Sequence, residues 1–269
     1  MTFHIQLAIA ILMTCHWPAI QETSSPLNKT ITLPGNVPLQ LRWIPPGTFQ
    51  MGSAESEAGR DADEGPLHEV TLTRGFYLGI HEVTQAQWKA VMGTNPSIFV
   101  QGENPVERPV DSVSWEQCRL FIARLNALGL GKFRLPTEAE WEYACRAGTR
   151  TRFYWGDGVR LEEAHAYAWA NSRSYATTHS VGGKRPNGWG LYDMSGNVWE
   201  WCGDWYGPYS ADAQTDPTGP AQGREKVFRG GSWYDFPISL RSANRHRHAV
   251  DRGYTAIGLR LVMEEGGSR

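Results

Sequence analysis

NGWGLYDMSGNVWEW, residues 187–201, places three tryptophans and three glycines within fifteen positions, and Trp205 follows shortly after it. The whole chain has 12 tryptophans and 29 glycines, and it shows few long periodic runs beyond residue 151. Such a composition predicts many loops folded around buried rings. We therefore expect these tryptophans to fill the core, with a sugar or peptide groove as the alternative role.

Overall composition places the chain among ordinary soluble globular proteins. It has 269 residues, a charged fraction of 20% and a formal net charge of −2. No sustained basic stripe occurs, so the electrostatic signature of nucleic-acid binding is absent and we expect no nucleic-acid partner. The length allows one large domain with a real core, and no internal repeat indicates a second.

The N-terminal segment resembles a secretory signal. The apolar stretch Ile5–Met13 is too short to span a bilayer and is followed by small and polar residues, although no Lys or Arg precedes it. Thr14 fits poorly the small residue expected before a lipid-modified Cys15. We expect a signal segment at 1–21, a linker at 22–38, a folded domain at 39–265 and a tail at 266–269. The predicted location is secreted, periplasmic or envelope-associated, with no transmembrane span in the mature chain.

Three helix starts can be predicted from capping signals. Thr84 precedes QAQWKAVMG, and Ser114 begins a Ser-x-x-Gln pattern ahead of a helical apolar spacing at Phe121, Leu125 and Leu128. Thr137 follows a proline and precedes acidic residues that suit a helix N-terminus. The acidic segment 53–70 instead reads as an exposed loop whose charges are solvated.

The cysteines predict neither a zinc site nor a complete disulfide set. Removal of the leader leaves Cys118, Cys145 and Cys202, an odd number, without CxxC or Cys/His metal spacing. Each can be a small buried apolar side chain, or two of them can form one disulfide.

Seven ordered motifs together resemble one known family. They are IPPGTFQMGS (44–53), HEVTQAQW (81–88), PVDSVSWEQC (109–118), RLPTEAEWEYACRAGT (134–149), NGWGLYDMSGNVWEW (187–201), RGGSW (229–233) and IGLRLV (257–262). In this order they resemble the formylglycine-generating enzyme family, also called the sulfatase-modifying factor family, from about Leu41 to Val262. The resemblance implies an α+β fold, an elaborated C-type-lectin-like fold with little regular secondary structure.

The resemblance also shows what is missing. In family members that oxidise a sulfatase cysteine to formylglycine, two cysteines after the GGS motif bind copper(I), an ion that prefers thiolate ligands. This sequence has Tyr234, Asp235 and Phe236 in the first region and no cysteine after Cys202. Copper is therefore not expected. Likewise, Cys145 matches a position that is disulfide-bonded in some members, but Ser242 stands where the partner would be.

Calcium is the cofactor that the resemblance implies. In YDMSGNVWEW the family places a calcium ion whose ligands correspond here to the side chains of Asp193 and Glu200 and the carbonyls of Gly196 and Val198. Mixed oxygen ligands suit Ca²⁺. The alternative is that the two carboxylates cap turns and pair with arginines. A second family calcium site corresponds to Asn171 and Ser172, but it lacks its aspartate here and is expected to be incomplete.

Between framework residues of the last forty positions lies a set of aromatic and polar side chains typical of recognition surfaces. We call it the C-terminal surface; its members are Tyr234, Asp235, Phe236, Ile238, His246, Arg247, His248, Tyr254 and Thr255. Similar positions vary in the ligand-binding variable proteins that share this fold, an analogy only. The nearby arginines Arg229, Arg241, Arg245 and Arg260 are expected to hold loops by contacting carbonyls and carboxylates.

The sequence suggests two main functions and a third, weaker one. The first is an exported, calcium-stabilised family member that lacks copper oxidase activity and binds a protein, peptide or glycan through Tyr234, Asp235, Phe236, His246, Arg247, His248 and Tyr254. The alternative is an oxidoreductase of the same family with non-cysteine metal ligands, for which Asp235, His246 and His248 are the candidate catalytic residues. A structural subunit of an envelope assembly is a third possibility.

Overall fold

The computed structural model describes residues 27–158, 160–171 and 176–266. The predicted signal segment, Cys15, Ser172 and the last three residues of the predicted tail lie outside these ranges. Among the described residues, no helix combines the length and the hydropathy that crossing a membrane requires.

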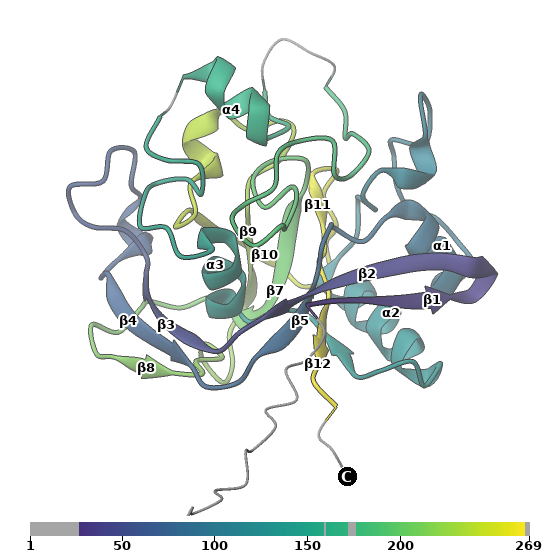
Figure 1. The fold of residues 1–269 in the computed structure, drawn as a ribbon, viewed down its shortest axis with the longest axis horizontal. Coiled ribbons are helices and arrows are strands. Elements are labelled where there is room, and N and C mark those ends of the chain that lie inside the picture. Colours follow the sequence, from purple (N-terminus) through teal and green to yellow (C-terminus); the bar gives the residue numbers. More distant parts are fainter. Residues whose placement is uncertain (1–26, 159, 172–175, 267–269) are drawn as a thin grey trace, which may run out of the picture.

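The chain forms three sheets with helices packed around them (Figure 1). The strands are β1 (Asn28–Leu33), β2 (Val37–Ile44), β3 (Gly47–Met51), β4 (His68–Leu72), β5 (Phe76–Gly79), β6 (Phe133–Arg134), β7 (Trp199–Trp205), β8 (Gln214–Thr215), β9 (Glu225–Arg229), β10 (Arg245–Ala249), β11 (Ile257–Gly258) and β12 (Val262–Glu264). The helices are α1 (Gln85–Met92), α2 (Trp115–Ala127), α3 (Glu138–Arg146) and α4 (Leu161–Tyr167), with 3-10 turns η1 (Pro34–Asn36), η2 (Ala62–Glu64), η3 (Pro105–Glu107) and η4 (Pro237–Leu240). This mixture confirms the α+β prediction.

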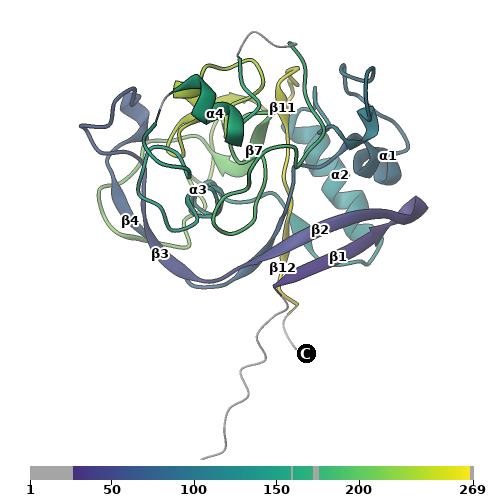
Figure 2. The ribbon, with the colours of Figure 1, turned by 45° about the horizontal axis from the view of Figure 1, so that its top comes forward.

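Sheet order separates sequence neighbours. The sheets run β1-β2-β5-β12-β6, β10-β9-β7-β11 and β3-β4-β8. β2 and β3 follow one another along one edge of the molecule, so a single stretch of chain links the first and third sheets (Figures 1 and 2). The second sheet carries three members of the C-terminal surface, because its edge strand β10 contains His246, Arg247 and His248. The other members lie in the segments after β9 and before β11.

The structure differs from the predicted boundary between the linker and the folded domain. Where a linker was expected at residues 22–38, Asn28–Leu33 forms β1 and pairs with β2 along its whole length. Alternating burial explains this, since Ile31 and Leu33 face the core. Of the three residues at helical spacing, Phe121 and Leu125 are fully buried, whereas Leu128 is the exposed C-cap of α2.

All three predicted helix starts are confirmed. Thr84, Ser114 and Thr137 each accept a hydrogen bond from the third backbone N–H of their helix. The Gln or Glu side chain at that third position accepts a bond from the backbone N–H of the capping residue. Local sequence alone determines these caps. Every residue of α3 is buried, so this helix forms the centre of one core cluster, while α1 and α2 pack on another through the stacked rings of Trp88 and Phe121.

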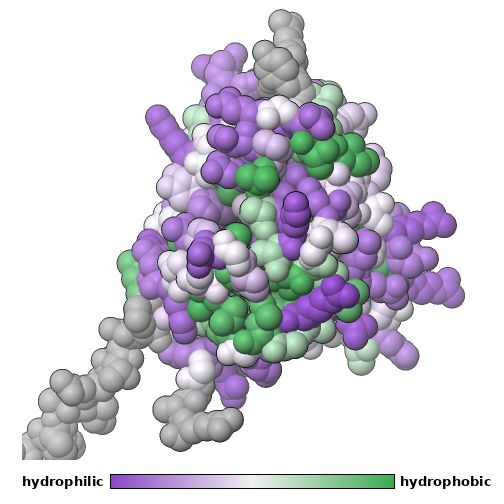
Figure 3. Space-filling model, turned by 90° about the vertical axis from the view of Figure 1, so that its right-hand side faces the viewer, coloured by the Kyte–Doolittle hydropathy of each residue, from purple (hydrophilic) through white to green (hydrophobic). Residues whose placement is uncertain are grey.

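Apolar side chains also remain on the surface over α2. The side of the molecule that carries α1 and α2 shows apolar surface gathered among hydrophilic residues (Figure 3). Leu120, Leu128 and Leu130 on α2 and the turn after it are between 37% and 47% exposed. Single exposed leucines are normal on protein surfaces, and these carry no functional argument.

Candidate functional site

The turn after β9 is organised by the carboxylate of Asp235. Its Oδ2 atom accepts hydrogen bonds from Ser232 N–H at 3.0 Å, Ser232 Oγ at 2.5 Å and Trp199 Nε1 at 2.9 Å. The backbone carbonyl of Asp235 accepts a further bond from Asn171 N–H. Asp235 was expected to face a ligand or a metal; its contacts instead fix the turn to β7 and to the segment after α4.

Aromatic side chains on both sides of Asp235 extend into solvent. Tyr234 is 60% exposed, Phe236 is 67% exposed, and Tyr254 from the loop before β11 is 55% exposed. Ile238 in η4 adds a further exposed apolar side chain. Since large rings normally bury their area, three exposed rings on the turn after β9 and on the loop before β11 indicate a contact surface.

The two histidines of β10 have different environments from the arginine between them. The ring of His246 lies 5.0 Å from the Trp199 ring and 5.8 Å from the Phe228 ring. Arg247, one position along the strand, pairs with Glu225 at 3.1 Å and lies over the Tyr206 ring. Alternation along the strand places His248 on the face of His246. Asp235 and His246 each contact the Trp199 side chain, Asp235 by a hydrogen bond and His246 by ring packing.

A metal centre at these residues was the alternative expectation. Within the described ranges, no group of three or more His, Cys, Asp or Glu side chains is arranged to hold a metal ion. The ring of His179 stacks on that of Trp169, with ring centroids 3.8 Å apart.

Buried arginines hold the framework beneath the surface, as the sequence predicted. Arg229 donates to Glu138 and Glu142 and to the carbonyls of Ser242 and Ala243. Arg245 forms a two-pronged pair with Glu138 as well. Such charge-assisted bonds with fixed geometry leave the loops little freedom.

Arg241 overturns the expectation that the acidic segment 53–70 is merely solvated. Its guanidinium binds Glu64 through two bonds of 2.6 Å and Glu57 through one of 3.0 Å, and Glu64 is fully buried. The pair crosses 177 positions of sequence, so no local pattern could reveal it. The charged loop is therefore a structural brace for the segment that carries the surface.

In the stretch predicted to bind calcium, the carboxylate of Glu200 is already engaged by other side chains, whereas Asp193 keeps one oxygen open. Both oxygens of Glu200 are bound, by Arg260 at 2.7–3.0 Å and by Trp141 Nε1 at 2.7 Å. Asp193 accepts a 2.6 Å bond from Gly182 N–H through Oδ2, while its buried Oδ1 has no partner among the described residues. Burial raises the pKa of Asp193 to about 6, and burial together with Asp193 and Glu200 raises that of Glu82.

These contacts test the fit of calcium. The ligand set is only partly open: Asp193 offers one unpaired oxygen, but Glu200 would have to release Arg260 or Trp141 first. Gly196, with φ 85°, and Val198 lie on the intervening turn, where a Cβ at Gly196 would come within 2.2 Å of the Trp169 carbonyl oxygen. The alternative expectation, that a carboxylate here pairs with an arginine, matches Glu200. The second expected site retains Asn171, whose N–H bonds to Asp235, while Ser172 is outside the described residues.

All three cysteines in the described part are unpaired and buried. Cys145 Sγ lies 3.6 Å from Ser242 Oγ, so Ser242 occupies the place that the resemblance gave to a disulfide partner. Burial raises the pKa of the Cys145 thiol to about 12, which makes it a poor nucleophile.

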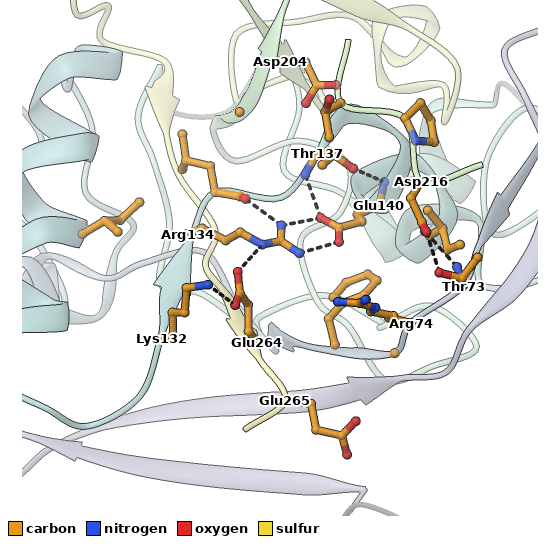
Figure 4. A pocket seen from close by; sticks show the side chains of 18 of the residues that line it. Thr73, Arg74, Lys132, Arg134, Thr137, Glu140, Asp204, Asp216, Glu264 and Glu265 are labelled. Atoms are coloured by element: carbon orange, nitrogen blue, oxygen red, sulfur yellow. Dashed lines mark hydrogen bonds and ion pairs between the residues drawn. The ribbon is translucent and has the colours of Figure 1, made fainter. Parts of the chain in front are cut away.

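A large groove, about 1510 Å³, lies elsewhere, at the end of the molecule where β12 finishes (Figure 4). Arg134 sits between Glu140, which it binds through two 2.6 Å bonds, and Glu264 (Figure 4). Asp204 lies at its edge, where burial and neighbouring Glu138 raise the pKa to about 7. Sequence reasoning missed this groove because distant segments build it, and no residue of the C-terminal surface lines it in the described chain.

The chain is similar to several known proteins. The model of the sulfatase-modifying factor enzyme 1-like domain matches residues 32–265. A formylglycine-generating enzyme of Thermomonospora curvata is 30% identical, covering 77% of this chain and 86% of its own. The serine/threonine-protein kinase pkn1 of Chlamydia caviae is 34% identical over 83% of this chain, which spans only 38% of the kinase. Among solved structures, Treponema denticola variable protein 1 has a TM-score of 0.81 and 31% identity, covering 90% of this chain and 100% of its own.

Proposed function

The chain belongs to the sulfatase-modifying factor enzyme 1-like family, and we propose that it is an exported binding member of that family. In this proposal the C-terminal surface holds a protein, peptide or glycan, and copper-dependent formylglycine generation is absent. Export rests on the sequence of the N-terminal segment, and N-terminal sequencing of the mature protein tests it. The kinase and formylglycine-generating activities named for the relatives are not carried over.

The exposed rings of Tyr234, Phe236 and Tyr254 are the observation that carries the proposal. Aromatic side chains supply large contact areas and lose little conformational entropy when they bind. The Asp235 bonds and the pairing of Arg241 with Glu64 hold the backbone near Tyr234 and Phe236 in place before a ligand arrives. Binding to a fixed surface costs less ordering than binding to a flexible loop.

The absent cysteines support the second half of the proposal. Copper(I) selects thiolate ligands, and no cysteine follows Cys202 in the sequence. Cys202 itself is fully buried within β7. The surface that would present a copper ion in the active relatives therefore presents rings in this chain.

A displayed library of random peptides tests the binding surface. Peptides selected on the wild-type protein should lose at least about tenfold in affinity for a Tyr234→Ser, Phe236→Ser, Tyr254→Ser variant, since a buried ring contributes well over 1 kcal/mol at an interface. A Leu120→Ser, Leu128→Ser variant, which also removes exposed apolar area, should bind as the wild type does. Equal binding by both variants would refute this surface as the binding site.

The oxidoreductase alternative is supported only by the shared contact of Asp235 and His246 with Trp199. Elemental analysis of protein purified without chelators or metal-binding tags decides between the two. Near-stoichiometric iron or copper that disappears in an Asp235→Ala, His246→Ala, His248→Ala variant would favour the enzyme. Absence of transition metal from the wild type would reject it.

Calcium stabilisation is a separate part of the proposal. Asp193 Oδ1 is the open ligand, and the three carboxyl groups of Glu82, Asp193 and Glu200 share one arginine, Arg260. A divalent cation would offset the remaining negative charge. If the protein proves to bind no calcium, the proposed role of the C-terminal surface still stands.

A further inference from the structure

A second, small cavity lies beneath the C-terminal surface. It measures about 90 Å³. Since one water needs roughly 10–15 Å³ of such space, several waters or one group of carboxylate or phosphate size would fit. The polar and aromatic residues that line it are His165, Trp169, Thr177, His179, Lys184 and Trp233.

The lining of this cavity offers hydrogen-bond donors and a cation but no carboxylate. The sequence from His165 to Arg185 contains neither Asp nor Glu. Lys184 Nζ lies 3.8 Å from the centroid of the Trp169 ring. Thr177 Oγ accepts a 2.7 Å bond from Arg108, so the hydroxyl hydrogen of Thr177 remains available for another acceptor.

Three nitrogens of the lining residues lack hydrogen-bond partners. Trp169 Nε1, Trp233 Nε1 and His165 Nε2 are buried and have no hydrogen-bond partner in the described structure. A buried polar atom without a partner costs roughly 1–3 kcal/mol. An accumulation of three such atoms around one cavity indicates that the protein alone does not complete this site.

The charges that act on His179 are cationic, and the larger charge effect on His165 also comes from a cation. Burial, then the charges of Arg108 and Lys184, lowers the pKa of His179 to about 4, and burial and Lys184 also lower the pKa of His165. Asp193 near Lys184 and Glu162 near His165 are the opposing carboxyl groups, and neither of them lines the cavity. An anion placed here would meet an attractive potential.

We propose that this cavity binds a small oxyanion, either a free ion or the carboxylate, phosphate or sulfate group of a larger ligand. The indole N–H groups would donate to its oxygens and the Lys184 ammonium would balance its charge. Trp233 joins the cavity to the C-terminal surface, because its ring contacts that of Tyr234 at 5.5 Å. The inference does not depend on the proposed function, since it concerns the anion alone.

Nuclear magnetic resonance of the indole N–H groups tests the site directly. Inorganic phosphate and acetate are titrated separately into wild-type protein at constant ionic strength, with chloride as the balancing ion. Two indole signals, identified by loss in Trp169→Phe and Trp233→Phe variants, should shift and saturate together. The Trp205 signal, identified in the same way, should stay in place.

Variants separate a specific site from general attraction. Lys184→Gln should weaken the binding of the preferred anion roughly tenfold or more, and Trp233→Phe about fivefold, through loss of one donor. Lys132→Gln, which removes an exposed lysine paired with Glu264, should have no effect. Saturation in the wild type with either anion and a selective loss in Lys184→Gln support the proposal.

Two results would overturn it. One is the absence of saturable indole shifts in the wild type with both anions, which would mean that water alone fills the cavity. The other is equal weakening by Lys132→Gln and Lys184→Gln. Should Lys184→Gln fail to fold, the wild-type titration and Trp233→Phe still decide. Phosphate without acetate binding identifies a tetrahedral anion as the ligand class.

Discussion

A Ser242→Cys substitution should create a disulfide with Cys145. The two side chains are fully buried, and Cys145 Sγ lies 3.6 Å from Ser242 Oγ. Small rotations of the two side chains can bring a pair of sulfurs from this separation to bonding distance. Because burial raises the thiol pKa of Cys145 to about 12, the bond should form during oxidative refolding, before the site closes.

The size of the effect follows from the length of chain that the bond would enclose. The two positions are 97 apart in sequence. A loop of about 100 residues corresponds to roughly 4.7 kcal/mol of unfolded-state entropy, an upper value from which any strain is subtracted. For a protein of this size each kcal/mol raises Tm by roughly 2–4 °C. We expect oxidised Ser242→Cys to melt roughly 10 °C or more above its reduced form.

The assay combines thiol counting with calorimetry. Denatured, oxidised Ser242→Cys should present two fewer reactive thiols than the same protein after reduction, and only the oxidised form should show the raised Tm. Ser242→Ala provides the control, since it removes the hydroxyl without adding a sulfur. An unchanged thiol count after oxidative refolding would show that the reasoning about this contact is wrong.

Three further predictions concern buried charge. Arg229→Met should destabilise the protein by about 3–5 kcal/mol in urea unfolding, because Glu138 and Glu142 would each lose one of their two buried arginine partners; a loss below about 1 kcal/mol would contradict this. The folded Asp204 carboxyl, with a pKa near 7 against an ordinary 3.8, binds a proton between about pH 4 and 7 that the unfolded chain releases, so stability should fall as pH rises through this window. Asp204→Asn should flatten that fall in Tm, and an unaltered slope would refute the assignment. Purified protein should contain about one calcium per chain, removal by a chelator should lower Tm, and Asp193→Asn should abolish both effects; calcium-free wild type would reject the calcium proposal.

Features encoded within a few residues could be predicted from the sequence. The capping boxes at Thr84, Ser114 and Thr137 specify helix starts through contacts only three positions long. The motif order gave the family, and with it the mixed fold. The arginine contacts were predictable in kind, because a buried guanidinium requires acceptors.

Features that depend on distant partners could not be predicted. Glu64 reads as one of several solvated acids, and only its contact with Arg241 explains its burial. Asp235 reads as a ligand-facing carboxylate, but Trp199 and Ser232 use its charge to fix a turn. The small cavity arises where the segment after α4 meets Trp233, and its lining residues carry no mutual spacing that a sequence reveals.

The place of β12 in its sheet has a consequence for synthesis. β12 lies between β5 and β6, and β6 joins the five-stranded sheet only through it. Until residues 262–264 have left the ribosome, this sheet has a gap in its middle and Val262 is missing from the core. A product of premature termination would therefore expose apolar strand faces to proteases, so the fold itself distinguishes finished chains from unfinished ones.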